Sequence, residues 1–341
     1  MEKKKIQLGQ FFTKASLWLK PQITNFINQS GCSIAYDPFA GGGDLLKAAK
    51  DILLFKTVKG LDIDDSLNWE TNDSLLNIPH VDKAIIITNP PYLSNYSASR
   101  KKIYDTVAVY FEFSIYDDLY LIALDKMLDA QDYVVAIIPE TFINSSFKRK
   151  SRLNSITVLE DNPFEDTDTP VCVVCFDTTE KNLNEIKVYK NDEYVFSLSK
   201  MESLRLETMN SVKIKFNVLS AWLGLRAVDT TNPKEMIKFD FKENFDYDWD
   251  KGIKVSSRLL SVIDINIPEK DKKAFIDECN SVLSKIREES KDIILSPFKG
   301  NMKNGVRRRR LDFYTARAIM EKAYANLYGG AEENVEQLRL F

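Results

Sequence analysis

The chain has 341 residues, 44% of them hydrophobic, which is enough for two domains with buried cores. Its net charge is −3, and its single histidine, His80, excludes zinc sites that need several histidines. Four cysteines are too few for a disulfide framework in a chain of this length. No apolar run is long enough to cross a membrane, and residues 1–6 lack the apolar stretch of a signal peptide, so a cytoplasmic location is expected.

Charge is divided unevenly along the chain. Residues 1–180 hold 18 Lys and Arg against 25 Asp and Glu, whereas residues 181–341 hold 29 against 25. The alternation of strands and helices described below also fades near residue 180. Together these changes predict a catalytic domain over residues 1–180 and a second domain over residues 181–341 that binds a polyanion.

The first strongly patterned segment is a strand, a glycine-rich turn and a helix. A helix is expected over residues 17–29, followed by a strand over residues 33–36 and the turn Asp37-Pro38-Phe39-Ala40-Gly41-Gly42-Gly43. Helical spacing resumes over residues 45–54. This order is typical of the first unit of a nucleotide-binding α/β domain, because glycines let a ligand approach the backbone and the start of the helix.

Two acidic positions come next in the chain. A second strand, predicted over residues 58–64, ends in acids and contains Asp62 and Ile63, and the pair Asp73-Ser74 follows a short distance later. A carboxylate at the end of that strand can accept hydrogen bonds from both hydroxyls of a ribose. Taken singly, each acid would be interpreted as a helix cap or a turn residue.

The most informative stretch is Asn89-Pro90-Pro91-Tyr92, which follows a buried strand predicted over residues 84–88. The two prolines force a stiff, extended backbone. They hold the Asn89 amide and the Pro90 carbonyl at the carboxyl edge of the sheet, where open α/β proteins bind ligands. Hydrogen-bond acceptors beside the ring of Tyr92 suit a planar ring that carries an amino group. Alone, the tetrapeptide is equally consistent with a strand-ending turn.

Further strands complete a doubly wound, mostly parallel α/β sheet. Helical spacing over residues 110–128 separates the earlier strands from three more, predicted over residues 133–139, 151–159 and 171–176. The last strand contains Cys172 and Cys175, spaced like a metal or redox pair. Alternation along a strand places their thiols on opposite faces, which predicts buried structural cysteines.

With these segments in this order, residues 6–177 resemble S-adenosylmethionine-dependent amino methyltransferases, and most closely the gamma-class N6-adenine DNA methyltransferases of restriction–modification systems. Residues 7–13 resemble the family's N-terminal cofactor motif, with Lys14 in place of its proline. The resemblance implies a Rossmann-like catalytic domain and a C-terminal α+β target-recognition domain. The residues implied to bind the cofactor are Gln10, Phe11, Thr13, Asp37, Pro38, Phe39, Ala40, Gly41, Gly43, Asp62, Ile63, Asp73, Ser74 and Asn89.

The resemblance also implies the reaction and its partners. S-adenosylmethionine would supply a methyl group, without a metal, to the N6 amino group of an adenine flipped out of double-stranded DNA. The implied system is a type II restriction–modification system with a separately acting endonuclease. The side-chain oxygen of Asn89 and the carbonyl of Pro90 would accept the amino hydrogens. The implied catalytic set is Asn89, Pro90, Pro91, Tyr92 and Phe164, with the two aromatic rings against the flipped base.

The second half carries the basic surplus. Helices are expected over residues 271–291 and after Arg310, the latter burying Ala316, Ile319, Met320, Ala323 and Leu327. Between them, residues 299–310 contain six basic residues and no acid. A charge run is usually a solvated face, but 16 basic against 9 acidic residues over 251–320 favour DNA contact. The expected DNA-binding residues are Arg100, Lys101, Lys148, Arg149, Lys303, Arg307, Arg308, Arg309 and Arg310.

Three alternatives stay open at this point. Asn-Pro-Pro-Tyr also occurs in enzymes that methylate adenine or guanine amino groups in RNA, and in enzymes that methylate glutamine in release factors. Cofactor motifs at the N-terminus followed by a basic half favour DNA, with RNA as the stronger rival. The third alternative is a non-catalytic module that binds the cofactor and holds DNA.

Overall fold

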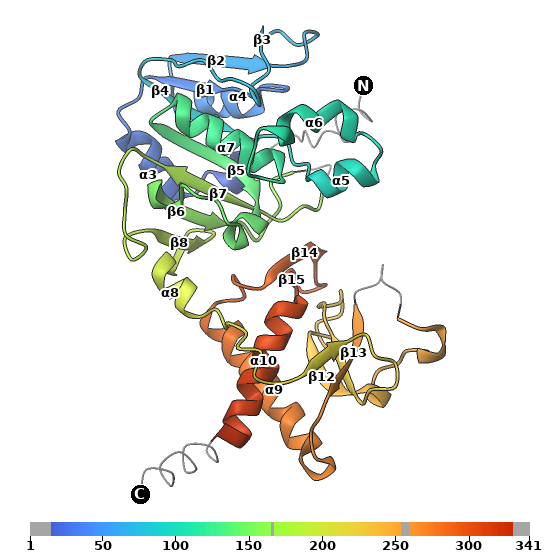
Figure 1. Ribbon diagram of the computed structural model, residues 1–341. Helices are drawn as coiled ribbons and strands as arrows, with labels where there is room; N and C mark the ends of the chain where they lie inside the picture. The colour runs from blue at the N-terminus through green and yellow to red at the C-terminus, as the bar shows by residue number, and fades with distance from the viewer. Residues whose placement is uncertain (1–14, 165–166, 254–258, 330–341) are drawn as a thin grey trace, which may run out of the picture. The chain divides into compact units, whose positions relative to one another are not determined.

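The computed structural model describes residues 15–164, 167–253 and 259–329, and the chain divides into two compact units, residues 1–200 and 201–341 (Figure 1). The predicted boundary at residue 180 lies too early, because β8 (Lys187–Lys190) and β9 (Glu193–Ser197) extend the sheet of the first unit. The predicted cofactor residues Gln10, Phe11 and Thr13 lie outside the described residues.

The first unit is built on a nine-stranded sheet in the order β3-β2-β1-β4-β5-β7-β6-β8-β9. The strands from β3 to β5 are parallel, and β7 runs antiparallel to β5 and β6. The chain reverses its direction of progress between β1 and β4, which makes their carboxyl ends the switch point of the sheet. This confirms the predicted doubly wound, mostly parallel α/β fold. The strand bounds are β1 Ile34–Asp37, β2 Thr57–Asp62, β3 Glu70–Thr71, β4 Ala84–Thr88, β5 Tyr133–Pro139, β6 Leu153–Val158 and β7 Val171–Phe176.

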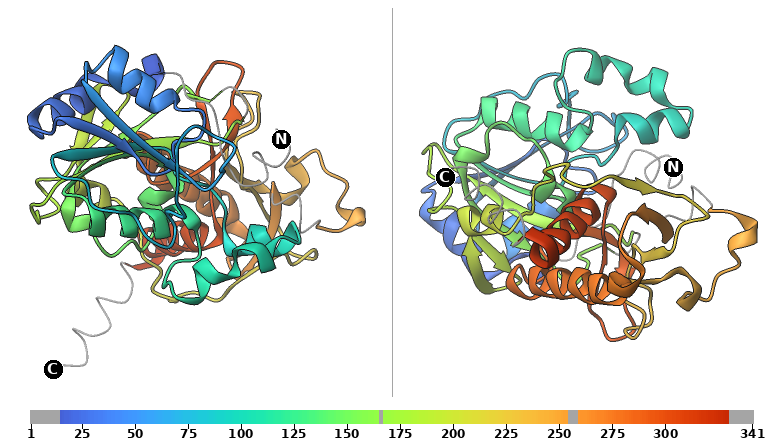
Figure 2. Two further views of the ribbon diagram at one scale, coloured as in Figure 1. Left: turned by 90° about the horizontal axis from the view of Figure 1, so that it is seen from above. Right: turned by 60° about the horizontal axis from the view of Figure 1, so that its bottom comes forward.

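Helices cover both faces of this sheet, as the view from above shows (Figure 2, left). On one face, α2 (Ala15–Trp18), α3 (Pro21–Gln29) and α4 (Asp44–Asp51) share a buried core with alternate residues of β1, β4 and β5. On the other face, α7 (Leu119–Ala130) packs on β5. All five residues of β4 are therefore buried, which explains its continuous apolar sequence.

Two of the predicted helices are interrupted. The helix expected over residues 17–29 breaks between α2 and α3, because Pro21 has no N–H with which to continue the preceding helix. The pattern over residues 110–128 belongs to α7 and to α6 (Tyr104–Glu112). Residues 94–118, which contain α6 and α5 (Asn95–Arg100), form what we call the α5–α6 lobe, and a bridge between Ser94 and Asp118 joins its two ends.

The second unit is an α+β structure, as predicted. It contains a four-stranded antiparallel sheet in the order β10-β13-β11-β12, a two-stranded hairpin of β14 and β15, and two helices, α9 and α10, that pack together. The helix α8 (Leu198–Ser203) precedes this sheet. Within α10, Ala316, Ile319, Met320 and Ala323 are buried, but Leu327 in the final turn is 40% exposed. The bounds are β10 Ile214–Phe216, β11 Leu223–Arg226, β12 Lys238–Phe241, β13 Leu260–Ile265, α9 Lys272–Glu289, β14 Ser296–Asn301, β15 Arg307–Arg310 and α10 Phe313–Tyr328.

A buried ion pair ties α9 to β15 in the second unit. The fully buried carboxylate of Asp229 accepts two hydrogen bonds from the guanidinium of Arg287, at 3.0 and 2.9 Å. It also accepts the backbone N–H groups of Ile237 and Arg309, at 2.9 and 3.0 Å. A buried carboxylate is tolerated only when its oxygens are fully hydrogen-bonded, and this one has four donors.

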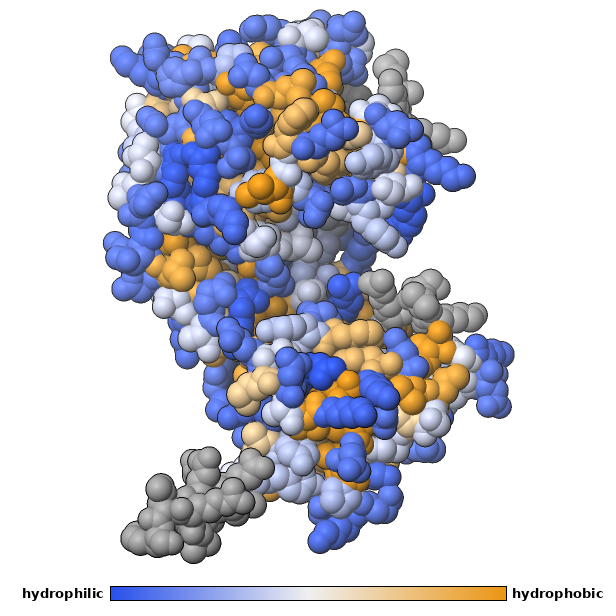
Figure 3. Space-filling view, viewed as in Figure 1, coloured by the Kyte–Doolittle hydropathy of each residue, from blue (hydrophilic) through white to orange (hydrophobic). Residues whose placement is uncertain are grey.

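The surface is mixed in polarity. Hydrophilic residues cover much of the face shown in Figure 3, and apolar residues gather in patches between them. Within the described ranges, the structure contains no helix both long and apolar enough to cross a membrane.

Candidate active site

Two side chains hold the glycine-rich loop after β1 in place. Asp62, the last residue of β2, accepts the backbone N–H of Gly41 at 2.8 Å and that of Asp64 at 2.9 Å, one on each carboxylate oxygen. The indole N–H of Trp69 donates to the carbonyl of Gly41 at 3.0 Å. Gly41 is thereby held on both sides in the left-handed region, with φ of +51°. The conformation of the loop is therefore fixed by contacts within the protein.

Trp69 belongs to no recognised sequence motif, but the position of its ring explains why two nearby residues are glycine. A Cβ on Gly43 would come within 2.8 Å of the indole ring, and one on Gly60 would come within 2.5 Å of it. Contacts this short force the ring to move. Gly43 was predicted to bind the cofactor, but its lack of a side chain makes room for the ring of Trp69. It does not line the pocket described next.

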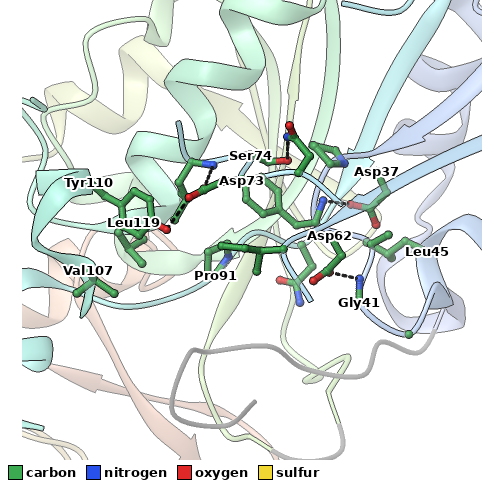
Figure 4. Close-up of a pocket in the computed structure, with 18 of the residues that line it drawn as sticks. Asp37, Gly41, Leu45, Asp62, Asp73, Ser74, Pro91, Val107, Tyr110 and Leu119 are labelled. Atoms are coloured by element: carbon green, nitrogen blue, oxygen red, sulfur yellow. Dashed lines mark hydrogen bonds between the residues drawn. The ribbon is translucent and has the colours of Figure 1, made fainter. Parts of the chain in front are cut away.

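A pocket of about 210 Å³ opens at the switch point between β1 and β4 (Figure 4). All the described residues predicted to bind the cofactor line it except Gly43, namely Asp37, Pro38, Phe39, Ala40, Gly41, Asp62, Ile63, Asp73, Ser74 and Asn89. The remaining lining residues are Gly42, Asp44, Leu45, Asn72, Leu75, Pro91, Thr106, Val107, Tyr110 and Leu119. Segments far apart in the sequence therefore meet at the predicted sheet edge.

Asp37 is the most deeply buried acid of the pocket, at 1% exposure. Burial raises the pKa of its carboxyl to about 7, and the negative charge of Asp62 acts in the same direction. Hydrogen bonds from the Thr88 hydroxyl at 2.5 Å and the Phe39 N–H at 3.0 Å partly offset the rise in pKa. A cation in the pocket would favour the ionised form of this carboxyl.

The α5–α6 lobe closes one end of the pocket. The hydroxyl of Tyr110, on α6, donates to the carboxylate of Asp73 at 2.8 Å. Burial, together with this hydrogen bond, raises the pKa of Tyr110 to about 12, so its hydroxyl keeps its proton at neutral pH. Figure 4 shows Tyr110 and Val107 at the end of the pocket away from Leu45. Sequence reasoning missed Tyr110 and Val107, because nothing local to α6 marks it as a pocket wall.

The tetrapeptide that follows β4 lies at the same edge. Asn89 and Pro91 line the pocket, and Pro90 is buried. The hydroxyl of Tyr92 lies 2.5 Å from the side-chain oxygen of Asn89 and 2.7 Å from the carbonyl of Ile137 in β5. Burial raises the pKa of Tyr92 well above its ordinary value, so the hydroxyl is a donor. The hydroxyl has one proton, which the oxygens of Asn89 and Ile137 share, so Tyr92 lies between the amide of Asn89 and the neighbouring strand.

Tyr92 and Phe164 are neighbours, as the predicted pair of aromatic residues requires. Their ring centroids lie 6.2 Å apart in an edge-to-face arrangement. Phe164 is only 6% exposed, and both rings pack against the core of the first unit. Neither residue lines the pocket.

Three of the predicted DNA-binding arginines are buried or bind other groups of the protein. Arg307 and Arg309 are 3% and 1% exposed, because alternation along β15 points both side chains inward. Arg149 binds the carboxylate of Asp129 at 2.6 Å and the carbonyl of Leu128 at 2.9 Å, which braces α7. These positions correct the expectation that the whole basic run contacts DNA.

The other predicted DNA-binding residues keep some exposure. Arg308 is half-buried over the ring of Phe298, 4.8 Å from its centroid, and donates to the carbonyls of Asp229 and Lys299. Arg100, Lys101, Lys148 and Lys303 are exposed, and Arg310 is half-buried. Exposure alone leaves the DNA-binding role of these residues a prediction.

Comparisons with known proteins are distant. No protein family and no curated protein matches the sequence. The chain is similar to the methyltransferase subunit of a type I restriction–modification system from Streptococcus thermophilus, at 15% identity and a TM-score of 0.35, over 57% of this chain and 53% of that one. It is also similar to the M protein of the type I restriction enzyme EcoKI, at 10% identity and a TM-score of 0.33, over 79% and 69% of the two chains. The chain thus spans about half the length of the first of these structures, and neither likeness is high enough to assign a function.

Proposed function

We propose that the chain is an S-adenosylmethionine-dependent methyltransferase that modifies the N6 amino group of adenine in double-stranded DNA. The observation that carries the proposal is the meeting of two sets of residues at one sheet edge. The glycine loop, Asp62 and Asp73 line the same pocket as Asn89 and Pro91, although they come from separate segments of the chain. A strand-ending turn at Asn89 would need no such pocket.

The pocket has the hydrogen-bond acceptors that the cofactor requires. Each carboxylate oxygen of Asp62 accepts one backbone N–H and keeps a second lone pair, which suits the two hydroxyls of a ribose. Asp73 offers an acceptor for the adenine amino group, with Tyr110 beside it. When bound, S-adenosylmethionine supplies a methyl group on a positively charged sulfur, and the acid Asp37 lines the same pocket.

Asn89 and Pro90 would activate the amino group that receives the methyl. The lone pair of an adenine amino nitrogen is delocalised into the ring, which makes it a poor nucleophile. The side-chain oxygen of Asn89 and the carbonyl of Pro90 can accept its two hydrogens and stabilise the more tetrahedral nitrogen of the transition state. The oxygen of Asn89 retains a lone pair for this purpose when Tyr92 donates to it.

Replacing Tyr92 with phenylalanine separates its hydroxyl from its ring. We expect Tyr92→Phe to lower kcat by about tenfold, because the amide of Asn89 loses a donor that orients it, while the KM for DNA is retained. Steady-state kinetics over a range of DNA concentrations measures both constants. If kcat is unchanged, the hydroxyl does not position Asn89; if KM rises instead, the hydroxyl serves DNA binding.

Cofactor affinity should depend on pH through Asp37. Its carboxyl, with a pKa of about 7, is mostly neutral at pH 6 and mostly ionised at pH 8. Because the ionised form attracts a cation, the Kd for S-adenosylmethionine should fall by roughly tenfold from pH 6 to pH 7.5, a range in which the cofactor keeps its positive charge. Isothermal titration calorimetry measures this dependence. Asp37→Asn should remove it, and an equally steep dependence in that variant would assign it to another group.

We assign target recognition to the second unit, residues 201–341, and place the enzyme as the modification half of a type II restriction–modification system with a separate endonuclease. The exposed and half-buried basic residues Lys303, Arg308 and Arg310 support DNA binding by this unit, and Arg100, Lys101 and Lys148 support it in the first unit. Arginine and lysine side chains at such positions can pair with phosphates or with guanine edges in the major groove.

A direct comparison of substrates tests the proposal. The full chain is incubated with S-adenosylmethionine labelled in its methyl group and with duplex DNA, structured RNA or a release factor. Label should enter the DNA, at N6 of adenine, and neither of the other two. Transfer to RNA or to the release factor alone would replace DNA as the substrate, and transfer to none of them would favour a non-catalytic cofactor-binding module.

A further inference from the structure

The α5–α6 lobe, which closes one end of the pocket, has exposed apolar side chains. Four large apolar side chains of this short segment are solvent-exposed, Phe113 at 88%, Ile115 at 75%, Tyr96 at 74% and Val109 at 44%. Single exposed apolar residues are ordinary, but four within one lobe of 25 residues mark a binding surface. Figure 1 shows α5 and α6 standing apart from the helices that cover the sheet of the first unit.

Helical spacing connects this surface to the pocket. Thr106, Val109, Tyr110 and Phe113 are spaced i, i+3, i+4 and i+7, and therefore form one stripe along α6 and its C-terminal cap. Thr106 and Tyr110 line the pocket, whereas Val109 and Phe113 are exposed. The exposed end of the stripe therefore adjoins the part of α6 that forms the pocket wall.

The basic charges of the lobe lie together at the end of α5. Arg100, Lys101 and Lys102 are consecutive and exposed at the end of α5. The two acids of α6, Asp105 and Glu112, lie four residues before and three residues after Val109 and therefore border the stripe on one side, so the basic charge is confined to the end of α5. A solvent-exposed aromatic ring beside basic side chains is the combination that nucleic-acid-binding surfaces use for stacking and phosphate contact.

We propose that the α5–α6 lobe contacts duplex DNA at the target base and that Phe113 enters the base stack where the adenine has left it. This inference rests on the proposed function. Extruding a base costs stacking and pairing energy and leaves a gap in the duplex. An apolar ring that fills this gap offsets part of that cost, and the Phe113 side chain, at 88% exposure, needs no rearrangement to reach outward.

The experiment compares two duplexes and two variants of the full chain. One duplex carries a site found methylated in the DNA of cells that express the protein, and the other has an abasic position opposite the same target adenine, which is then unpaired. Phe113→Ala removes the ring, and Leu54→Ala removes a comparably exposed side chain, at 75%, from elsewhere in the first unit. The Kd for S-adenosylmethionine, measured for each protein, controls for folding of the pocket.

We expect Phe113→Ala to lower kcat/KM on the paired duplex by about tenfold. On the abasic duplex its kcat/KM should stay within about twofold of the unmodified protein, because the unpaired adenine leaves the stack without help from the Phe113 ring. Leu54→Ala should alter neither value. Equal activity of Phe113→Ala and the unmodified protein on the paired duplex would overturn the insertion of Phe113 into the base stack while leaving the proposed function intact. An equal loss on both duplexes would also overturn it, by assigning the lobe a structural or protein-binding role. Failure of the unmodified protein to methylate any DNA would overturn both proposals.

Discussion

Asn89→Ala should lower kcat for methyl transfer by about 100- to 1,000-fold, the cost of removing one preorganised hydrogen-bonding group that acts on the transition state. Asn89 lines the pocket, and its side-chain oxygen lies 2.5 Å from the hydroxyl of Tyr92. Cofactor affinity should change little, because the acids proposed to hold the cofactor, Asp62 and Asp73, are untouched. Single-turnover transfer from labelled S-adenosylmethionine at saturating DNA measures the chemical step.

A second pocket asparagine provides the matched control. The amide of Asn72 also lines the pocket, but it donates to the hydroxyl of Ser74 and the carbonyl of Asn77, both at 2.9 Å. Asn72→Ala should therefore lower thermal stability or cofactor affinity and leave kcat at saturating cofactor within about fivefold of the unmodified protein. Activity retained by Asn89→Ala would remove the tetrapeptide from the catalytic machinery.

Asp62→Ala should weaken binding of S-adenosylmethionine by at least about 100-fold. Two hydrogen bonds from ribose hydroxyls to a charged acceptor account for roughly 3 kcal/mol, and the glycine loop also loses the bond from Gly41 that closes it. Because the loss is one of binding, kcat should recover when the cofactor concentration is raised. Calorimetry gives the Kd, and steady-state kinetics over a wide range of cofactor concentration gives the split between KM and kcat.

Asp65 supplies the control for this change. It lies three residues further along the chain, is exposed and does not line the pocket. Asp65→Ala should keep the Kd within about twofold of the original value, as expected for a surface substitution. If Asp62→Ala binds the cofactor within threefold of the unmodified protein, the ribose is held elsewhere, and the acid serves only to fold the loop.

The strands that form the sheet centre were predictable to the residue, and the reason is their burial. β4, β5 and β7 are covered on both faces, so each is a continuous apolar run bounded by polar residues or proline. β8 and β9 were missed, and with them the boundary at residue 200. They lie at the edge of the sheet, where half-exposed residues give no strong periodic signal.

The candidate site was predictable where its residues follow strands, and not where they come from elsewhere. Asp37, Asp62 and Asn89 stand at the carboxyl ends of β1, β2 and β4, so sheet topology alone brings them together. Trp69 and Tyr110 reach the site through tertiary contacts, with Gly41 and Asp73 respectively. The local sequence around a side chain does not predict such contacts.

The basic run shows the same limit. Arg307 to Arg310 are identical in sequence, and only the pairing of β15 with β14 determines which of them face inward. Burial of Arg307 and Arg309 leaves Arg308 and Arg310 as the members of the run with exposed surface. Charge composition alone could not distinguish the buried arginines of this run from those with exposed surface.

Mapping N6-methyladenine in the DNA of cells that express the protein tests the central claim most directly. Cells expressing the unmodified chain should contain methylated adenines at one recurring sequence, and matched cells expressing Asn89→Ala should contain none above the host background. Absence of new methylated adenines with the unmodified chain, or their persistence with Asn89→Ala, would contradict the account.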